Sequence, residues 1–215
     1  MAEPDGADQR TALDLLPGAV LRRRALMVSA GAVLFGVIFG VAFGLAGGWL
    51  VGLIAAVVVG VPLVVLAAAE ARRHCWLQGG VVFVRALGTR SVDLRHATGM
   101  ELLITHVRGA TVVGVLVTGP PKGKTINVAV ATYAGGGGRE LDILALRRLA
   151  DALAAGSDTN GLVFAELLVA QLRAEARGEA GEARPLYRVA AMAPGGRLTQ
   201  RIPSDAVGKF VASLD

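Results

Sequence analysis

The chain has 215 residues, of which 53% are hydrophobic and 18% are charged, and its formal net charge is +5 at pH 7. Its length and hydrophobic content fit a pair of membrane helices, one modest domain and a tail. The single cysteine, Cys75, cannot form an intramolecular disulfide, which suits a reducing cytoplasmic environment.

Residues 1–24 form a polar tail with four acidic and four basic residues. We expect this tail to be cytoplasmic and flexible, with one helical turn at residues 11–16 that ends at Pro17-Gly18. No function is assigned to it.

Residues 25–69 hold two apolar runs without a charged residue, at 25–45 and 49–69, separated by Ala46-Gly47-Gly48. A helix rises about 1.5 Å per residue, so each run spans about 30 Å, the thickness of a bilayer's hydrocarbon core. The pattern predicts a transmembrane helical hairpin. Two buried helices of a soluble protein and a cleaved signal peptide are the alternatives, and runs of this length and position disfavour both.

Basic residues flank both ends of the expected hairpin, and its loop has none. Arg22, Arg23 and Arg24 precede it, and Arg72 and Arg73 follow it. The positive-inside bias then predicts a multi-pass protein of the plasma membrane with both termini in the cytoplasm.

Small residues recur every four positions in both runs and should share one helix face. They are Gly36, Gly40, Gly44, Gly52, Ala56 and Gly60. Such faces allow close approach of helix backbones. These faces could pack the two helices of one hairpin against each other, or they could form the interface of a homo-oligomer. Because Ser29 is the single polar side chain in the two runs, a transporter or pump acting alone is disfavoured.

The basic excess lies in residues 71–157, where eleven basic and five acidic residues give a net +6. A basic domain beside a cytoplasmic leaflet is attracted to anionic lipid headgroups. Arg72, Arg73, Lys122 and Lys124 are the candidate contacts. Ordinary positive-inside bias and solvated surface charge are the alternative.

Residues 70–157 are expected to form a domain of short antiparallel strands closed by a helix. The strands are predicted at residues 75–77, 81–87, 90–94, 100–107, 111–118 and 124–131, with a flexible connection at 135–138. Residues 139–154 then change to helical periodicity. These features predict an antiparallel meander rather than βαβ units.

This organisation resembles bacterial membrane proteins that carry a PH-like domain. The resemblance rests on residues 76–80 (WLQGG), 89–94 (TRSVDL) and the closing helix at 140–153. It implies an antiparallel β-roll of six or seven strands capped by a C-terminal helix, used as an adaptor or scaffold without a shared catalytic residue set. An arginine-rich composition, 19 Arg against 3 Lys, is typical of a GC-rich bacterial genome such as an actinobacterial one.

Residues 158–215 are expected to be a helical C-terminal extension. A helix is predicted at 162–177, a strand or irregular apolar segment at 186–192, and a short final helix capped by Ser204. These segments could pack on the roll, on the membrane or on a partner.

The sequence offers no catalytic, cofactor or metal site. Residues 119–125 (GPPKGKT) lack the glycine spacing of a P-loop, and His74, His96 and His106 lack metal-ligand spacing and are expected at the surface. Nucleic-acid binding is not expected. The sequence therefore predicts a non-enzymatic membrane adaptor or scaffold with an unknown protein partner. The alternative is a subunit of an oligomeric assembly or transporter built through the glycine faces.

Overall fold

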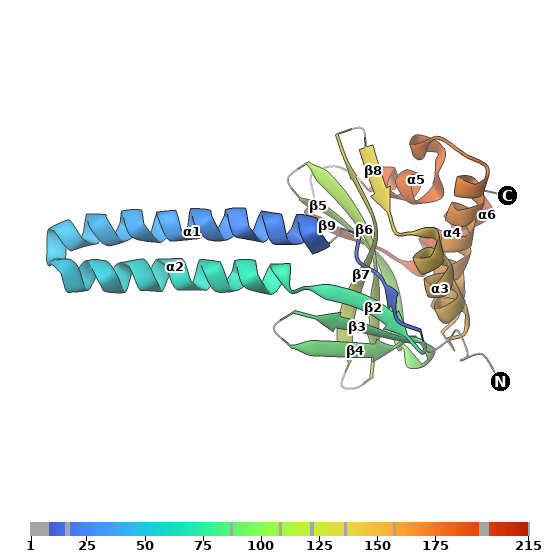
Figure 1. Cartoon of the computed structure of the whole chain (residues 1–215). Coiled ribbons are helices and arrows are strands. Elements are labelled where there is room, and N and C mark those ends of the chain that lie inside the picture. Colours follow the sequence, from blue (N-terminus) through green and yellow to red (C-terminus); the bar gives the residue numbers. More distant parts are fainter. Residues whose placement is uncertain are drawn as a thin grey trace, which may run out of the picture. The chain divides into compact units, whose positions relative to one another are not determined.

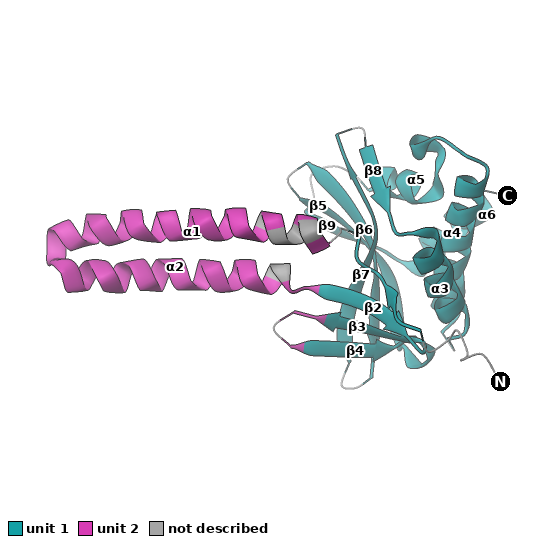
Figure 2. Cartoon of the chain, viewed as in Figure 1, with its two compact units in different colours: residues 1–15, 74–84, 89–215 teal, residues 16–73, 85–88 magenta. Residues whose placement is uncertain are grey.

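A computed structural model describes residues 9–15, 18–86, 88–107, 109–120, 123–135, 137–156, 158–193 and 198–214. The chain divides into two compact units, shown in Figure 2. We call residues 16–73 the hairpin; residues 85–88 group with it. The remaining residues form the second unit, which we call the domain.

The hairpin consists of helices α1 (Gly18–Gly47) and α2 (Trp49–Ala71). Gly48 alone separates them, with a φ of +89° that glycine adopts without strain. The loop is therefore shorter than the expected three residues. Helix α1 also begins earlier than residue 25, because the arginines before it are good helix formers.

Both helices are long and apolar enough to cross a membrane. The candidate spans, Ala25–Gly47 and Trp49–Ala69, have mean hydropathies of 2.4 and 2.9. Only 11% and 17% of these spans are buried within the chain, whereas the core helix of a soluble protein is mostly buried. The exposed apolar surface makes them candidate membrane helices.

The domain is an α+β unit with two antiparallel sheets rather than the single meander expected. The first sheet has the order β1-β2-β3-β4, formed by β1 (Thr11–Ala12), β2 (His74–Gln78), β3 (Val81–Arg85) and β4 (Thr89–Asp93). The second has the order β8-β7-β6-β5-β9, formed by β5 (Gly99–Val107), β6 (Ala110–Gly119), β7 (Lys124–Ala134), β8 (Gly137–Glu140) and β9 (Thr199–Ile202).

Four helices lie together on one side of the five-stranded sheet (Figure 1). They are α3 (Ile143–Ala154), α4 (Thr159–Ala176), α5 (Pro185–Met192) and α6 (Ser204–Ala212). Two short 3₁₀ turns, η2 (Leu94–His96) and η3 (Gly181–Ala183), complete the described elements.

The domain core is formed by inward side chains of both sheets and by the apolar faces of the helices. Its fully buried members include Val82, Val92, Leu102, Ile104, Val113, Val130, Leu146, Leu149, Phe164, Leu168 and Leu186. Since α4, α5 and α6 contribute to this single core, the C-terminal extension packs on the domain.

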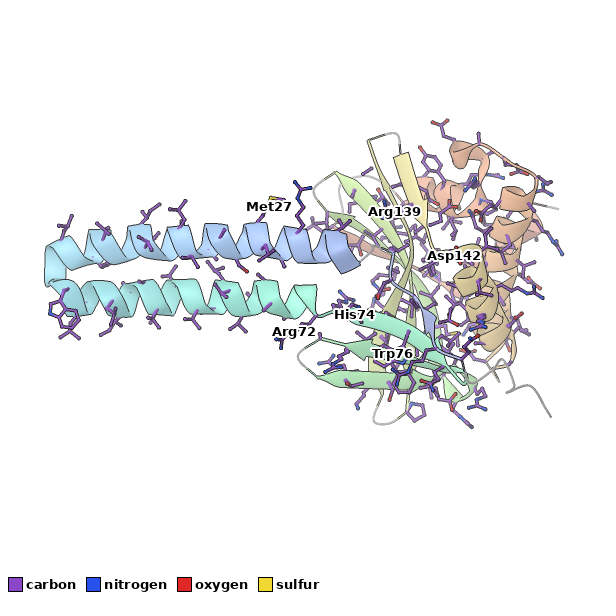
Figure 3. The ribbon with its side chains drawn as sticks, viewed as in Figure 1. Met27, Arg72, His74, Trp76, Arg139 and Asp142 are labelled. Carbon is purple, nitrogen blue, oxygen red and sulfur yellow. The ribbon has the colours of Figure 1, made fainter. Side chains whose placement is uncertain are left out.

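Strand β1, which precedes the hairpin, pairs with β2, which follows it. Thr11 is opposite Leu77 and Ala12 is opposite Trp76. Beyond the pair, the Asp14 carboxylate accepts a hydrogen bond from the backbone N–H of Cys75 at 2.8 Å and lies 3.1 Å from His74 Nδ1. His74 and Trp76 are labelled on β2 in Figure 3. The helical turn expected at residues 11–16 is therefore wrong, because a partner remote in sequence draws this segment into a sheet.

Four further expectations are corrected by the domain. The connection at 135–138 includes the start of strand β8, and α3 begins at Ile143 because Asp142 caps it by accepting from the backbone N–H of Leu144. Residues 186–192 are helical, since Pro185 occupies the first turn and Leu186 and Val189 share the buried face. Pro203, not Ser204, is the N-cap of α6.

Candidate functional site

Glu140, the last residue of β8, accepts hydrogen bonds from three different side chains. Its Oε1 accepts from the Tyr133 hydroxyl at 2.9 Å. Its Oε2 accepts from Gln171 Nε2 at 2.7 Å and from Arg184 Nη1 at 2.8 Å. The Glu140 side chain is only 10% exposed, so its charge is held by an ion pair and two neutral donors in a largely dry environment.

The β7–β8 hairpin places Tyr133 and Glu140 on the same sheet face. Tyr133 is opposite Gly138, and Glu140 lies two residues further along β8. A Cβ at position 138 would lie only 2.5 Å from Tyr133 Cδ1, so the ring covers the glycine backbone directly. Gly138 therefore has a structural purpose, because it leaves room for the tyrosine ring whose hydroxyl reaches the carboxylate.

The other two partners come from the helical side of the domain. Gln171 is fully buried in α4, and its Oε1 accepts from the backbone N–H of Leu186 at 3.0 Å. Arg184, just before α5, also donates from Nε to the Glu179 carbonyl at 3.1 Å. Through Glu140, the network joins the five-stranded sheet to α4 and α5.

Tyr133 is held as a neutral phenol by this environment. Burial, the negative charge of Glu140 and the hydrogen bond to it raise the pKa of Tyr133 above its ordinary value of 10.0, against an opposing effect of Arg184. The edge of a second ring, that of Tyr187, packs on it with the centroids 5.1 Å apart. The hydroxyl is thus a hydrogen-bond donor to Glu140, not a base.

A cavity of about 960 Å³ lies beside this network. The β7–β8 turn, the start of α3, the end of α4 and the η3–α5 segment all line it; among its residues are Gly135, Asp142, Glu175, Glu182, Arg184 and Tyr187. Arg139 of β8 and Asp142, labelled in Figure 3, mark the connection from the β7–β8 hairpin to α3. Its size is that of a ligand pocket.

The cavity carries an excess of negative charge. Glu140 is paired with Arg184, and Asp142 caps α3. Two carboxylates remain, Glu182 on the exposed side and Glu175 on α4. Within the described part of the chain, the buried Oε2 of Glu175 has no hydrogen-bond partner. A buried carboxylate oxygen without a donor is costly, and a donor or cation that reached the Glu175 side chain from the cavity would reduce this cost.

The described residues contain no group of three or more His, Cys, Asp or Glu side chains arranged to hold a metal ion. His74 and His96 are exposed and each lies beside an aspartate. The third histidine departs from the surface position expected for it. His106 is half-buried in β5, its Nδ1 is 2.9 Å from Thr111 Oγ1, and its buried Nε2 has no partner in the described part of the chain.

The six small residues expected at a helix interface lie between α1 and α2, where the structure brings them together. A Cβ on Gly40 would lie 2.9 Å from Ala56 Cβ, and one on Gly36 would lie 3.3 Å from Gly60 Cα. Gly44 faces Gly52 at 3.6 Å by the same measure. Within the hairpin, the glycine faces therefore contact each other.

Three of the four residues expected to contact anionic lipid are described, and they belong to two different units. Arg72 and Arg73 are exposed just after α2 in the hairpin, and Lys124 is exposed at the start of β7 in the domain. Lys122 lies outside the described residues.

The Glu140 network was not identified from the sequence. One signal was present: Gln171 follows Phe164 and Leu168 at helical spacing, which puts a polar side chain on the buried face of α4. A buried amide requires partners. The identity of those partners depends on contacts between residues 31 and 44 positions apart, which sequence spacing does not reveal.

Comparisons of this chain with protein-family models, with characterised proteins and with solved structures give no significant match.

Proposed function

We propose that this chain is a non-enzymatic membrane-anchored adaptor whose domain binds a basic group of a protein partner in the 960 Å³ cavity. The observation that carries the proposal is the buried Oε2 of Glu175, which has no hydrogen-bond partner among the described residues, in a cavity wall that also holds Glu182. An arginine or lysine side chain would supply the missing donor and neutralise the excess charge.

The pairing of β1 with β2 supports the anchored topology. These strands flank the hairpin and pair with each other, which favours an arrangement with both ends of the hairpin on one side of any bilayer that it crosses. The arginines at both ends favour the cytoplasmic side. The proposed localisation is therefore the plasma membrane, with the domain and both termini in the cytoplasm.

A PH-like relationship of the domain is part of the same proposal. Its support is the order of elements: strands β2–β4 in one antiparallel sheet, β5–β7 in a second, and helix α3 after them. Strands β1, β8 and β9 and helices α4–α6 are additions to that pattern.

The test uses the full chain in phosphatidylcholine nanodiscs as bait for partners from a membrane-free extract of the source cells, with mass spectrometry of what is retained. Glu175→Gln keeps the shape of the side chain and removes its charge. Glu166→Gln, an exposed position on the same helix outside the cavity, is the matched control. We expect a partner that is retained by the wild type and the control and lost with Glu175→Gln. Equal retention by all three would contradict a binding role for the cavity.

An oligomeric membrane assembly is the second candidate function. The glycine faces contact each other within the hairpin, so an assembly would need another surface. A groove of about 310 Å³ offers one for a helix of a second copy. Gly36, Ala56 and Gly60 contribute to its lining, together with Val33, Val37, Val57, Val61 and Val65. Crosslinking in membranes tests this candidate: a discrete oligomer that is lost with Val61→Phe favours assembly, and a monomer excludes it.

A further inference from the structure

A second cavity of the domain, of about 650 Å³, is lined by three arginines from two elements. Arg95 comes from η2, and Arg147 and Arg148 come from α3. Gln9, Gln78 and the Gly79-Gly80 turn also line the cavity. Leu77, Leu144 and Ala152 add an apolar part to the lining. This cavity shares no lining residue with the acidic one.

The Arg95 guanidinium is fixed in place against the β2–β3 turn. It donates from Nη2 to the Gly79 carbonyl at 3.0 Å and from Nε to Asp93 Oδ1 at 3.3 Å. A Cβ on Gly80 would lie 3.3 Å from Arg95 Nε, so the glycine allows the planar group to lie close to the turn. Pre-ordering of this kind reduces the entropy that a ligand must overcome.

Arg148 is ordered by Gln9 and by the first residue of β1, Thr11. Its Nη1 donates to Thr11 Oγ1 at 2.5 Å, and its Nη2 donates to Gln9 Oε1 at 2.9 Å. Arg147, its neighbour, is exposed and has no side-chain hydrogen bond or ion pair among the residues that the structure describes. Arg147 therefore retains its full set of donors beside two oriented guanidinium groups.

Arg95 is paired with Asp93, whereas Arg147 and Arg148 have no ion pair with an acidic residue among the described residues. Asp151 lines the cavity on α3, yet no ion pair joins it to an arginine within the described residues. Guanidinium groups bind phosphate and carboxylate through paired hydrogen bonds, and phosphate monoesters present the most acceptor oxygens and charge. The leucine and alanine side chains suit an apolar group attached to the ester.

We propose that this arginine-lined cavity binds a phosphate monoester that carries an apolar group, with Arg147 as the main new contact and Arg95 and Arg148 as oriented neighbours. The ester is either a soluble metabolite or a lipid headgroup. This site is independent of the proposed partner site, because the two cavities share no lining residue and their proposed ligands have opposite charges.

The soluble source is tested by titrating phenyl phosphate into the full chain in phosphatidylcholine nanodiscs at low salt, with calorimetry. Arg147→Gln is the test variant because its side chain is exposed and its loss should not disturb folding; Arg139→Gln on β8 is the control with the same charge change. We expect binding by the wild type and the control, and a loss of about tenfold or more in affinity with Arg147→Gln. Equal weakening by both variants would mean that net charge alone attracts the anion and would overturn the proposal.

The lipid source is tested with the same three proteins by flotation with vesicles of phosphatidylcholine containing phosphatidic acid. Recruitment that Arg147→Gln abolishes and Arg139→Gln preserves assigns the site to a lipid headgroup. Binding of phenyl phosphate without recruitment assigns it to a soluble ester. If the wild type binds neither probe, the proposal is wrong.

Discussion

Asp14 accepts a hydrogen bond from the backbone N–H of Cys75 across a separation of 61 residues, which spans the entire hairpin. Removing this carboxylate with Asp14→Ala should lower the free energy of unfolding of the domain by about 1 kcal/mol, since a charged acceptor of a backbone N–H is lost. Denaturation followed by the fluorescence of Trp76, in a Trp49→Phe background, would measure it.

The conservative variant Asp14→Asn separates the two contacts of this residue. Its amide oxygen keeps an acceptor for Cys75 N–H but loses the charge beside His74. We expect Asp14→Asn to lower the free energy of unfolding by less than Asp14→Ala does. A loss as large as that of alanine would mean that the His74 contact, not the backbone bond, stabilises the pairing.

The Glu140–Arg184 pair should be far more sensitive to substitution than a surface pair. Arg184→Met leaves a carboxylate that is 10% exposed without its cation, and we expect a loss of about 3–5 kcal/mol in the free energy of unfolding. Arg177→Met removes the surface ion pair between Arg177 and Glu179, in which the Arg177 side chain is 64% exposed. This variant should lower the free energy of unfolding by less than about 1 kcal/mol. Chemical denaturation of both variants makes the comparison, and equal losses would refute a structural role for the network.

From the raised pKa of Tyr133 we expect the stability of the domain to change at alkaline pH. Because its pKa is raised in the folded state above 10.0, its contribution is complete below pH 10 and is lost as the pH rises towards the folded-state value. The free energy of unfolding should therefore fall above about pH 10 in the wild type, and Tyr133→Phe should remove part of this slope. Denaturation curves between about pH 8 and 11.5 test it. An unchanged slope in Tyr133→Phe would be inconsistent with the raised pKa.

Within the hairpin, Gly40 is a position at which helix packing can be tested, and Gly31 is its matched control. A Cβ on Gly40 would meet Ala56, whereas one on Gly31 meets nothing within 4 Å. Gly40→Ala should weaken the α1–α2 contact by about 1–3 kcal/mol through overpacking, and Gly31→Ala should be neutral or slightly favourable. Titration with a denaturing detergent, followed by Trp49 fluorescence, distinguishes them.

Topology can be mapped with single cysteines in a Cys75→Ser background. A cysteine at Gly47 should react with an impermeant thiol reagent added outside intact cells, and cysteines at Glu101 and Gln200 should stay protected until the cells are opened. Labelling of the two domain positions from outside would reverse the proposed orientation.

Apart from α5, the described helices follow from local patterns, as do most of the described strands, and these were predictable. The charge-free runs and the alternation of Ile126, Val128 and Val130 need no knowledge of distant contacts. Strand β9 was missed because Thr199–Ile202 has no partner nearby in sequence; it pairs with β5 about a hundred residues earlier. Short strands of this kind are defined by their neighbours rather than by propensity.

The two cavities were beyond sequence analysis for a related reason. Arg147 and Arg148 read as a basic pair on a helix, and only the packing of α3 beside η2 and β1 brings them to Arg95 and Gln9. In the sequence, Glu175 and Glu182 are two of many charged residues in a C-terminal segment with no net charge. In the folded domain, α4 and η3 bring both carboxylates to one cavity.

The pairing of β1 with β2 also has a consequence for biosynthesis. The ribosome makes β1 first, and its partner emerges only after both apolar helices. If the hairpin spans a bilayer, a chain that inserts only one helix leaves the two strands on opposite sides, where Leu13 cannot reach the core that buries it to 2% exposure. Completion of the first sheet thus distinguishes correctly inserted chains from misinserted ones, and the latter expose an unpaired β2 edge to proteolysis.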